Sequence, residues 1–219
     1  MRKIIVAAFL SLDGVMQSPG GPAEDPVGGF KHGGWTVPYF DETMGSAVSE
    51  LFAKPFDMLL GRKTYEIFAA HWPHVGADDP IGSLFDRITK YVATRNPNFE
   101  LSWQNSQRLG SDAVDAIRKL KSEQGPDLVT QGSPDFLQTL FKNDLVDELN
   151  VWTFPIILGK GKRLFGDGVA PVALKLAASK VSASGITINK YLREGPIATG
   201  SFQLEHPTEA ELERRRNLS

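Results

Sequence analysis

Two glycine turns are the strongest chemical signal in the sequence. Each follows a short apolar run and opens a stretch with helical spacing: Gly61-Arg62-Lys63-Thr64 after residues 57–60, and Gln131-Gly132-Ser133 after residues 127–130. The first residues of a helix carry backbone N–H groups without intrahelical partners, and these groups bind anions. Arg62 and Lys63 add two cations, so the first turn suits a phosphate-bearing ligand. The alternative is an ordinary strand-to-helix turn with a solvated basic pair.

A third cluster of donors, Thr94-Arg95-Asn96, ends the apolar run at residues 90–94. If these runs are parallel strands, all three turns lie at the carboxyl edge of one sheet, where ligands bind in such folds. Two anion sites on one edge suit a dinucleotide. Arg62 and Arg95 could both contact a ribose 2′-phosphate, which would select NADPH over NADH. The sequence lacks Gly-x-Gly-x-x-Gly after its first apolar run and lacks Gly-Lys-Ser/Thr, which argues against a Rossmann site and a Walker phosphate loop.

Strand and helix patterns alternate along the chain, which predicts an α/β fold with a mostly parallel central sheet. The continuous apolar run Ile4–Leu10 predicts a strand buried on both faces. Asp41 suits the N-cap of a helix over residues 41–53, and Ser133 suits that of a later helix. A Gly- and Pro-rich loop over residues 17–38 is long enough to bind or cover a ligand. Other helices are predicted over 63–70, 81–87, 112–121 and 134–142, and late strands over 149–154, 172–178 and 186–192.

Composition excludes several classes of function. The 219 residues are 41% hydrophobic and 23% charged, with a net charge of −2, so we expect a packed domain that binds neither nucleic acid nor membranes. The chain has no cysteine, which rules out disulfides, thiolate catalysis and cysteine-bound metals. His71 and His74 lack a supporting carboxylate pattern, so no metal site is expected. No run suits a secretory signal or a membrane span, and we expect a cytoplasmic protein.

Several motifs in the same order resemble the dihydrofolate reductase-like family. Gly61-Arg62-Lys63-Thr64 is similar to the Gly-Arg-x-Thr turn of dihydrofolate reductases, and Gln131-Gly132-Ser133 stands where that family has a glycine pair. Three further segments are similar to the C-terminal reductase domain of the riboflavin-biosynthesis protein RibD: Ser11-Leu12-Asp13-Gly14, Asp147-Glu148-Leu149, and Pro155 to Gly161 with Leu164-Phe165. The resemblance covers about residues 2–195. We therefore expect one reductase domain at 1–195 and an extension with a short helix, opened by a Thr208/Glu211 capping box, at 196–219.

The resemblance implies a three-layer dihydrofolate reductase-like fold with NADPH as the hydride donor. Carried over position by position, it implies that Gly61, Arg62 and Thr64 bind the adenosine-side phosphates, and that Thr94 and Arg95 lie near the 2′-phosphate. Gln131, Gly132 and Ser133 would hold the pyrophosphate and the nicotinamide ribose. The backbone of Ala8 would meet the nicotinamide amide, and Asp13 would begin the mobile loop that closes over it.

The chain departs from dihydrofolate reductases where they carry an acid on the helix before the Gly-Arg turn. The aligned segment is Met44-Gly45-Ser46, and Asp41 and Glu42 stand one turn early. The substrate-side candidates are therefore Asp41 and Trp35, which could stack on a planar heterocycle or anchor its loop. A proton could come from Asp13, from His32 or from an ordered water. Lys160, Lys162 and Arg163 could bind a substrate phosphate or form a solvated turn.

The sequence thus favours an NADPH-dependent reductase of the RibD C-terminal type acting on a planar nitrogen heterocycle. The nearest named activity is 5-amino-6-(5-phosphoribosylamino)uracil reductase in riboflavin biosynthesis. One alternative is a dihydrofolate reductase with its carboxylate shifted to Asp41 or Glu42. Another is a non-catalytic nucleotide-binding protein. Family analogy suggests a homodimer, with the strand at Ile186–Leu192 as the candidate exposed edge.

Overall fold

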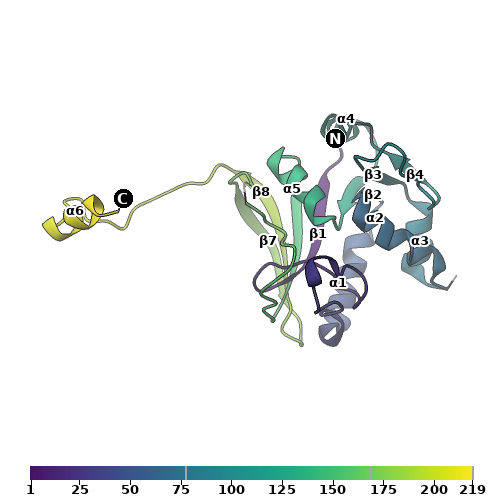
Figure 1. The fold of residues 1–219 in the computed structure, drawn as a ribbon, viewed down its shortest axis with the longest axis horizontal. Helices are drawn as coiled ribbons and strands as arrows, with labels where there is room; N and C mark the ends of the chain where they lie inside the picture. The colour runs from purple at the N-terminus through teal and green to yellow at the C-terminus, as the bar shows by residue number, and fades with distance from the viewer. Residues whose placement is uncertain (77, 168, 219) are drawn as a thin grey trace.

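A single eight-stranded sheet organises the computed structural model, which describes residues 1–76, 78–167 and 169–218 (Figure 1). The strand order is β4-β3-β2-β5-β1-β6-β8-β7. The pairs from β4 to β6 are parallel, whereas β8 pairs antiparallel with both β6 and β7. The strands are β1 Ile4–Ser11, β2 Phe56–Gly61, β3 Lys90–Ala93, β4 Ser106–Arg108, β5 Asp127–Thr130, β6 Glu148–Phe154, β7 Ala173–Val181 and β8 Thr187–Gly195.

Helices cover the two faces of the sheet. Residues of α1, α2 and α3 pack with one apolar cluster, and residues of α4 and α5 pack with another on the opposite face. The helices are α1 Glu42–Phe52, α2 Arg62–Ala69, α3 Pro80–Arg87, α4 Ala113–Ser122, α5 Pro134–Lys142 and α6 Glu209–Arg216, with short 3₁₀ turns at 27–29, 37–39 and 72–74. This arrangement confirms the predicted α/β fold, and no helix among the described residues is long and apolar enough to cross a membrane.

The apolar runs of the sequence became the central strands because only such runs can be buried on both faces. Every residue of β2 is buried, and β1 has six buried residues out of eight. Asp41 caps α1 as predicted, since its side chain accepts a hydrogen bond from the Met44 amide. Ser133 does not cap α5 through its side chain, contrary to the prediction. Strand β4 was not predicted, because three polar residues carry no strand pattern by themselves.

The exposed edge of the antiparallel end is β7, not β8. The segment Ile186–Leu192 was the predicted edge, but β8 forms hydrogen-bonded ladders with β6 on one side and β7 on the other. Eight of the nine residues of β7 are exposed. A strand this exposed presents unpaired backbone groups and apolar side chains that a second chain could cover.

The C-terminal segment lies apart from the domain. After β8 the chain runs away from the sheet and ends in α6 (Figure 1). Half of the predicted capping box is formed, because the Thr208 side chain accepts a hydrogen bond from the Glu211 amide. The Glu211 carboxylate does not return to Thr208; it forms ion pairs with Arg214 and Arg215 instead.

Lys90 is a fully buried cation beneath α3. Its Nζ donates hydrogen bonds to the carbonyls of Phe85 (2.7 Å) and Asp86 (3.3 Å), and it lies 4.3 Å from the centre of the Trp103 ring. Burial lowers the pKa of Lys90 from 10.5 to about 8. The ammonium therefore satisfies carbonyl groups in the last turn of α3, and its burial costs free energy because the charge loses its contact with water.

We expect this buried ammonium to make stability rise with pH. Between pH 8 and pH 10.5 the unfolded chain holds the Lys90 proton more tightly than the folded chain, so the free energy of unfolding increases across that window. The contribution should be on the order of 3 kcal/mol, because each pKa unit corresponds to about 1.4 kcal/mol. Urea unfolding at several pH values would measure it in the native protein and in Lys90→Met. An identical pH slope in both proteins would contradict the assignment.

Candidate functional site

The two glycine turns predicted from the sequence lie side by side in the fold. Strands β2 and β5 are neighbours, and the Gly61 amide donates a 3.0 Å hydrogen bond to the Gly132 carbonyl. The helices that follow these turns cover opposite faces, α2 on one and α5 on the other. Adjacent parallel strands whose connections leave to opposite faces open a crevice at their carboxyl ends, which is where ligands bind in α/β sheets.

The close approach of the turns requires glycine at both positions. A Cβ atom on Gly61 would lie 2.3 Å from Ser133 Oγ and 2.7 Å from Phe136 Cβ. A Cβ atom on Gly132 would lie 2.5 Å from Thr64 Oγ1, and Gly132 has a φ of +144°, which L side chains rarely adopt. The Gly132–Ser133 peptide is cis. The absent side chains therefore let two helix N-termini meet in one backbone-lined cradle.

The third predicted turn completes this edge. Strand β3 pairs with β2 on the side away from β5, with Ala93 opposite Gly61, so Thr94 and Arg95 follow directly beside Arg62. Thr94 shapes its turn by accepting a 3.1 Å hydrogen bond from the Asn96 amide. The structure therefore brings together all three donor clusters that lie far apart in the sequence.

The two arginines of this edge differ in how they are held. Arg62 forms a 2.6 Å ion pair with Glu66 and lies 5.8 Å from the centre of the Phe99 ring, which together orient its half-exposed guanidinium. Lys63 shares the same carboxylate at 3.2 Å. Arg95 is exposed, and no ion pair or hydrogen bond of its side chain is found within the described ranges. One cation is thus preoriented and one is free to meet an anion.

Strand β1 approaches the same cradle from the other side of β5. The pairing of β1 with β5 ends at Val6 and Thr130, so the backbone near Ala8 lies beyond the last paired residue and faces the Gln131–Ser133 turn. Ala8 itself is buried and pairs with Val151 of β6. This geometry agrees with the predicted position of Ala8, although its contact with a nicotinamide stays a prediction.

Asp13 anchors a loop instead of carrying an available proton. Its carboxylate accepts hydrogen bonds from Ser11 Oγ (2.6 Å) and from the amides of Leu158 (3.0 Å) and Gly159 (2.9 Å). The Ser11 hydroxyl, followed by the Leu158 amide, lowers the pKa of Asp13 to about 2. An ionised carboxylate cannot act as a general acid near neutral pH, so this geometry argues against the predicted proton-donor role.

Replacing Asp13 with Asn should loosen the contact between residues 11–14 and 157–159. An amide keeps one acceptor oxygen but turns an NH₂ group toward the donors, so we expect a loss of about 1–2 kcal/mol in unfolding free energy. Stability that native Asp13 contributes above pH 3.8 should disappear as the pH falls toward 2, because its folded pKa is depressed. Urea unfolding at pH 7 and in acid would test this, with Asp115→Asn on the exposed face of α4 as the control. Equal stability of native protein and Asp13→Asn at pH 7 would contradict it.

Trp35 anchors its loop, which was one of the two predicted roles. The indole is buried, donates a 2.8 Å hydrogen bond from Nε1 to the Gln17 carbonyl, and packs edge-on against Phe154.

Gln17 is a structural residue of the same loop that the sequence did not reveal, because an isolated glutamine in a loop has no distinctive pattern. Its side chain donates to the carbonyls of Asp25 and Val27 and accepts from the Lys162 amide, which fixes the loop against the segment after β6.

The remaining substrate-side candidates are either held by hydrogen bonds and ion pairs within the fold or exposed to solvent. Asp41 accepts hydrogen bonds from the Met44 amide and from the amide and hydroxyl of Ser184, and these bonds lower its pKa to about 2. Lys162 forms a 2.7 Å ion pair with Asp25, and the Arg163 side chain donates to the carbonyls of Asp13 and Gly159. His32 is exposed beside Phe30. Neither Asp41 nor this basic pair is left free for a ligand.

A second residue that the sequence did not reveal is Glu24, in the loop that follows β1. Its carboxylate accepts hydrogen bonds from the amides of Gly20 (2.6 Å) and Gly21 (3.1 Å). Burial nevertheless raises the pKa of Glu24 above its ordinary value, because the loss of solvent outweighs these two donors. Glu24 therefore retains a proton to higher pH than Asp13 or Asp41 does.

Relatives of known sequence and structure agree with this architecture. The chain is 26% identical over 188 residues to the uncharacterized protein YyaP of Bacillus subtilis, covering 84% of this chain and 92% of that one. A protein from Shewanella sp. PV-4 named for riboflavin biosynthesis has a TM-score of 0.60 at 21% identity and covers 88% of this chain and 99% of its own. Dihydrofolate reductase from Enterococcus faecalis, solved in complex with NADP(H) and RAB-propyl, has a TM-score of 0.55 at 15% identity and covers 87% of this chain and 96% of its own.

The fold is therefore dihydrofolate reductase-like, as the resemblance predicted. A family model for the RibD C-terminal domain matches residues 2–188, which is most of the chain. The order of motifs and the paired glycine turns lie within that match, which ends at the start of β8. The chain belongs to the RibD C-terminal domain family.

Proposed function

We propose that this protein is an NADPH-dependent reductase that transfers a hydride to a planar nitrogen heterocycle. The observation that carries the proposal is the contact between the two glycine turns, with Arg62 and Arg95 on neighbouring strands at the same edge. A backbone-lined cradle at two helix N-termini suits a pyrophosphate, and two adjacent arginines suit a further phosphate. The dinucleotide NADPH contains both groups.

The residues of the chain would hold and orient the cofactor while the cofactor supplies the hydride. Gly61, Thr64 and Gly132 would line the phosphate cradle, and the neighbouring Arg62 and Arg95 would meet the 2′-phosphate. Gln131 and Ser133 would contact the pyrophosphate and the ribose. The backbone at Ala8 would fix the nicotinamide amide, and the loop held by Gln17 and Trp35 would exclude water from the crevice.

Reduction of a C=N or C=O group also needs a proton, and Glu24 is our candidate for its source. It lies on the loop that follows β1 and has a raised pKa, whereas Asp13 and Asp41 are ionised. The shifted-carboxylate version of a dihydrofolate reductase is disfavoured for the same reason, because Asp41 already serves the helix and the β7–β8 turn. We therefore prefer ribosylated aminopyrimidines as the substrate class, because their reduction is the named activity nearest to this family.

Titration calorimetry with NADPH and NADH, followed by turnover assays, would test the proposal. We expect micromolar NADPH binding with a clear preference over NADH, and NADPH consumption with a ribosylaminopyrimidine but not with dihydrofolate. Consumption with dihydrofolate would favour the alternative activity. Tight NADPH binding without consumption across a heterocycle panel would favour a non-catalytic nucleotide-binding protein. Failure to bind either nucleotide would make the glycine turns purely structural.

A further inference from the structure

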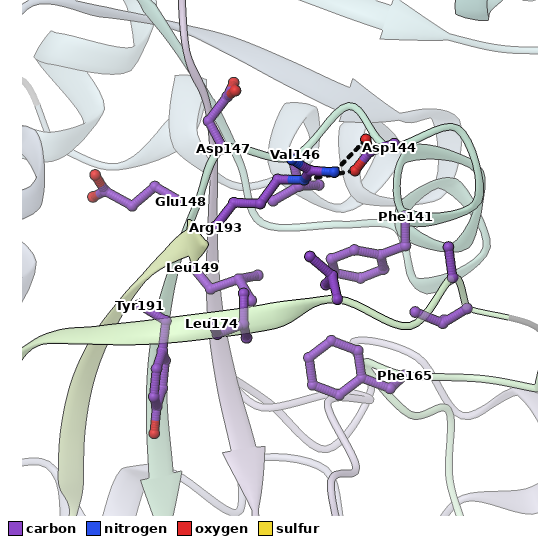
Figure 2. Close-up of a pocket in the computed structure, with 13 residues that line it drawn as sticks. Phe141, Asp144, Val146, Asp147, Glu148, Leu149, Phe165, Leu174, Tyr191 and Arg193 are labelled. Atoms are coloured by element: carbon purple, nitrogen blue, oxygen red, sulfur yellow. Dashed lines mark hydrogen bonds and ion pairs between the residues drawn. The ribbon is translucent and has the colours of Figure 1, made fainter. Parts of the chain in front are cut away.

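An apolar hollow opens where β8 ends, far from the glycine turns in the sheet order. It is lined by side chains from α5, β6, β7, β8 and the segment after β6, and Figure 2 shows the rings of Phe141 and Phe165 beside Leu174. The two rings lie 5.3 Å apart between centres. On its rim Arg193 forms a bidentate ion pair with Asp144, at 2.7 and 2.6 Å. The apolar and aromatic residues that line the hollow include Phe141, Val146, Leu149, Phe165, Leu174 and Tyr191.

The apolar surface continues from the hollow along β7. Leu174 pairs with Arg193 and Leu176 pairs with Tyr191, so both leucines share the face that carries the hollow. Leu174 is 37% exposed, Leu176 52% and Phe165 48%. Monomeric proteins rarely leave a contiguous apolar patch on an edge strand, because such a patch favours association. This face therefore needs a covering partner.

The tail formed by residues 196–218 carries the apolar side chains that such a face would bind. Phe202 is fully exposed, and Ile197 and Leu204 are 54% and 69% exposed. The hydrogen bonds of Gln203 and Arg215 join residues of the tail itself. The tail starts three residues after Arg193, which lies on the rim of the hollow, and it leads outward to α6 (Figure 1).

We propose that the tail of one chain docks Phe202 and Leu204 onto the hollow and the β7 face of a second copy. The tail begins at the rim of the hollow but leads away from its own sheet after β8 (Figure 1). Pro196 favours an extended backbone where the chain leaves β8, which directs the tail toward a neighbouring molecule. Six residues lie between Gly195 and Phe202, and the seven steps along the chain reach about 23 Å when extended. In a two-fold dimer the exchange is reciprocal, so both tails and both apolar faces are covered. This proposal is independent of the reductase activity.

Disulfide trapping tests which chain the tail binds. The native chain has no cysteine, so every disulfide that forms must join the introduced residues. In the full chain, Phe202→Cys combined with Leu176→Cys should give a covalent dimer on a non-reducing gel after mild oxidation. A mixture of the two single variants should give the same dimer. As a control, Phe202→Cys mixed with Leu12→Cys should give no dimer, since Leu12 is exposed at the carboxyl edge of β1. An intrachain disulfide without dimer, or no disulfide at all, would overturn the proposal.

Sedimentation equilibrium provides a second test that needs no oxidation. The 219-residue chain with Phe202→Ser and Leu204→Ser should form dimers with a dissociation constant at least tenfold higher than that of the native protein. Val27→Ser, another exposed apolar residue but in the loop after β1, should leave the dissociation constant unchanged. A monomeric native protein, or equal dimerisation of all three proteins, would refute the exchange of tails.

Discussion

Alanine at Gly61 or Gly132 should remove tight NADPH binding while leaving a folded but less stable protein. At Gly61 the new Cβ would overlap Ser133 Oγ and Phe136 Cβ, and at Gly132 it would overlap Thr64 Oγ1 in a backbone conformation that disfavours side chains. The two turns would have to separate, which displaces both helix N-termini. We expect each variant to lose about 1–3 kcal/mol of stability and at least tenfold in NADPH affinity.

Calorimetric titration and urea unfolding of the same preparations would separate the two effects. Gly110→Ala is the matched control, because a Cβ there would meet no atom within 4 Å. It should bind NADPH like the native protein. If Gly61→Ala and Gly132→Ala also bound NADPH with native affinity, the joined turns would not be the phosphate site.

Removing Arg62 and Arg95 together should weaken NADPH binding far more than NADH binding. Charge-assisted hydrogen bonds contribute about 1.5–3 kcal/mol each, so each lost contact to a 2′-phosphate should cost roughly 10–150-fold in affinity. NADH lacks that phosphate and should lose little. Arg95→Ala should account for most of the change in selectivity, because Arg62 is also held by Glu66 and Phe99.

Titration of Arg62→Ala, Arg95→Ala and the double variant with both nucleotides would measure this selectivity. Arg118→Ala is a suitable control, since Arg118 is an equally long cation paired with Asp115 on exposed α4. The effect should weaken as salt increases, because the side chains are partly exposed. Equal losses of NADPH and NADH affinity would remove the case for 2′-phosphate recognition.

The elements of this fold could be predicted where one segment carries its own pattern. The apolar run of β1, the helical spacing of α1 behind its Asp41 cap, and the glycine that ends β2 are all local properties of the sequence. Burial of a fully apolar strand and capping of a helix depend on neighbouring residues, so they can be read directly. Strand β4 escaped prediction because its three residues are strand only through pairing with β3.

The roles of the carboxylates depended on partners that the sequence places far away. Asp13 meets Leu158 and Gly159, and Asp41 meets Ser184, each more than 140 residues along the chain. No local pattern tells whether a carboxylate will be free or fully hydrogen-bonded. The raised pKa of Glu24 likewise comes from burial, which only the folded loop creates.

The sequence by itself determined the family, the order along the chain of the helices and of every strand except β4, and the three donor turns at strand ends. The tertiary structure alone decided that Gly61 touches Gly132, that β7 rather than β8 is the exposed edge, and that Asp13 and Asp41 are structural anions. The physical reason is that local propensity depends on adjacent residues, whereas contacts, desolvation and pKa values depend on which distant segments the sheet order places together.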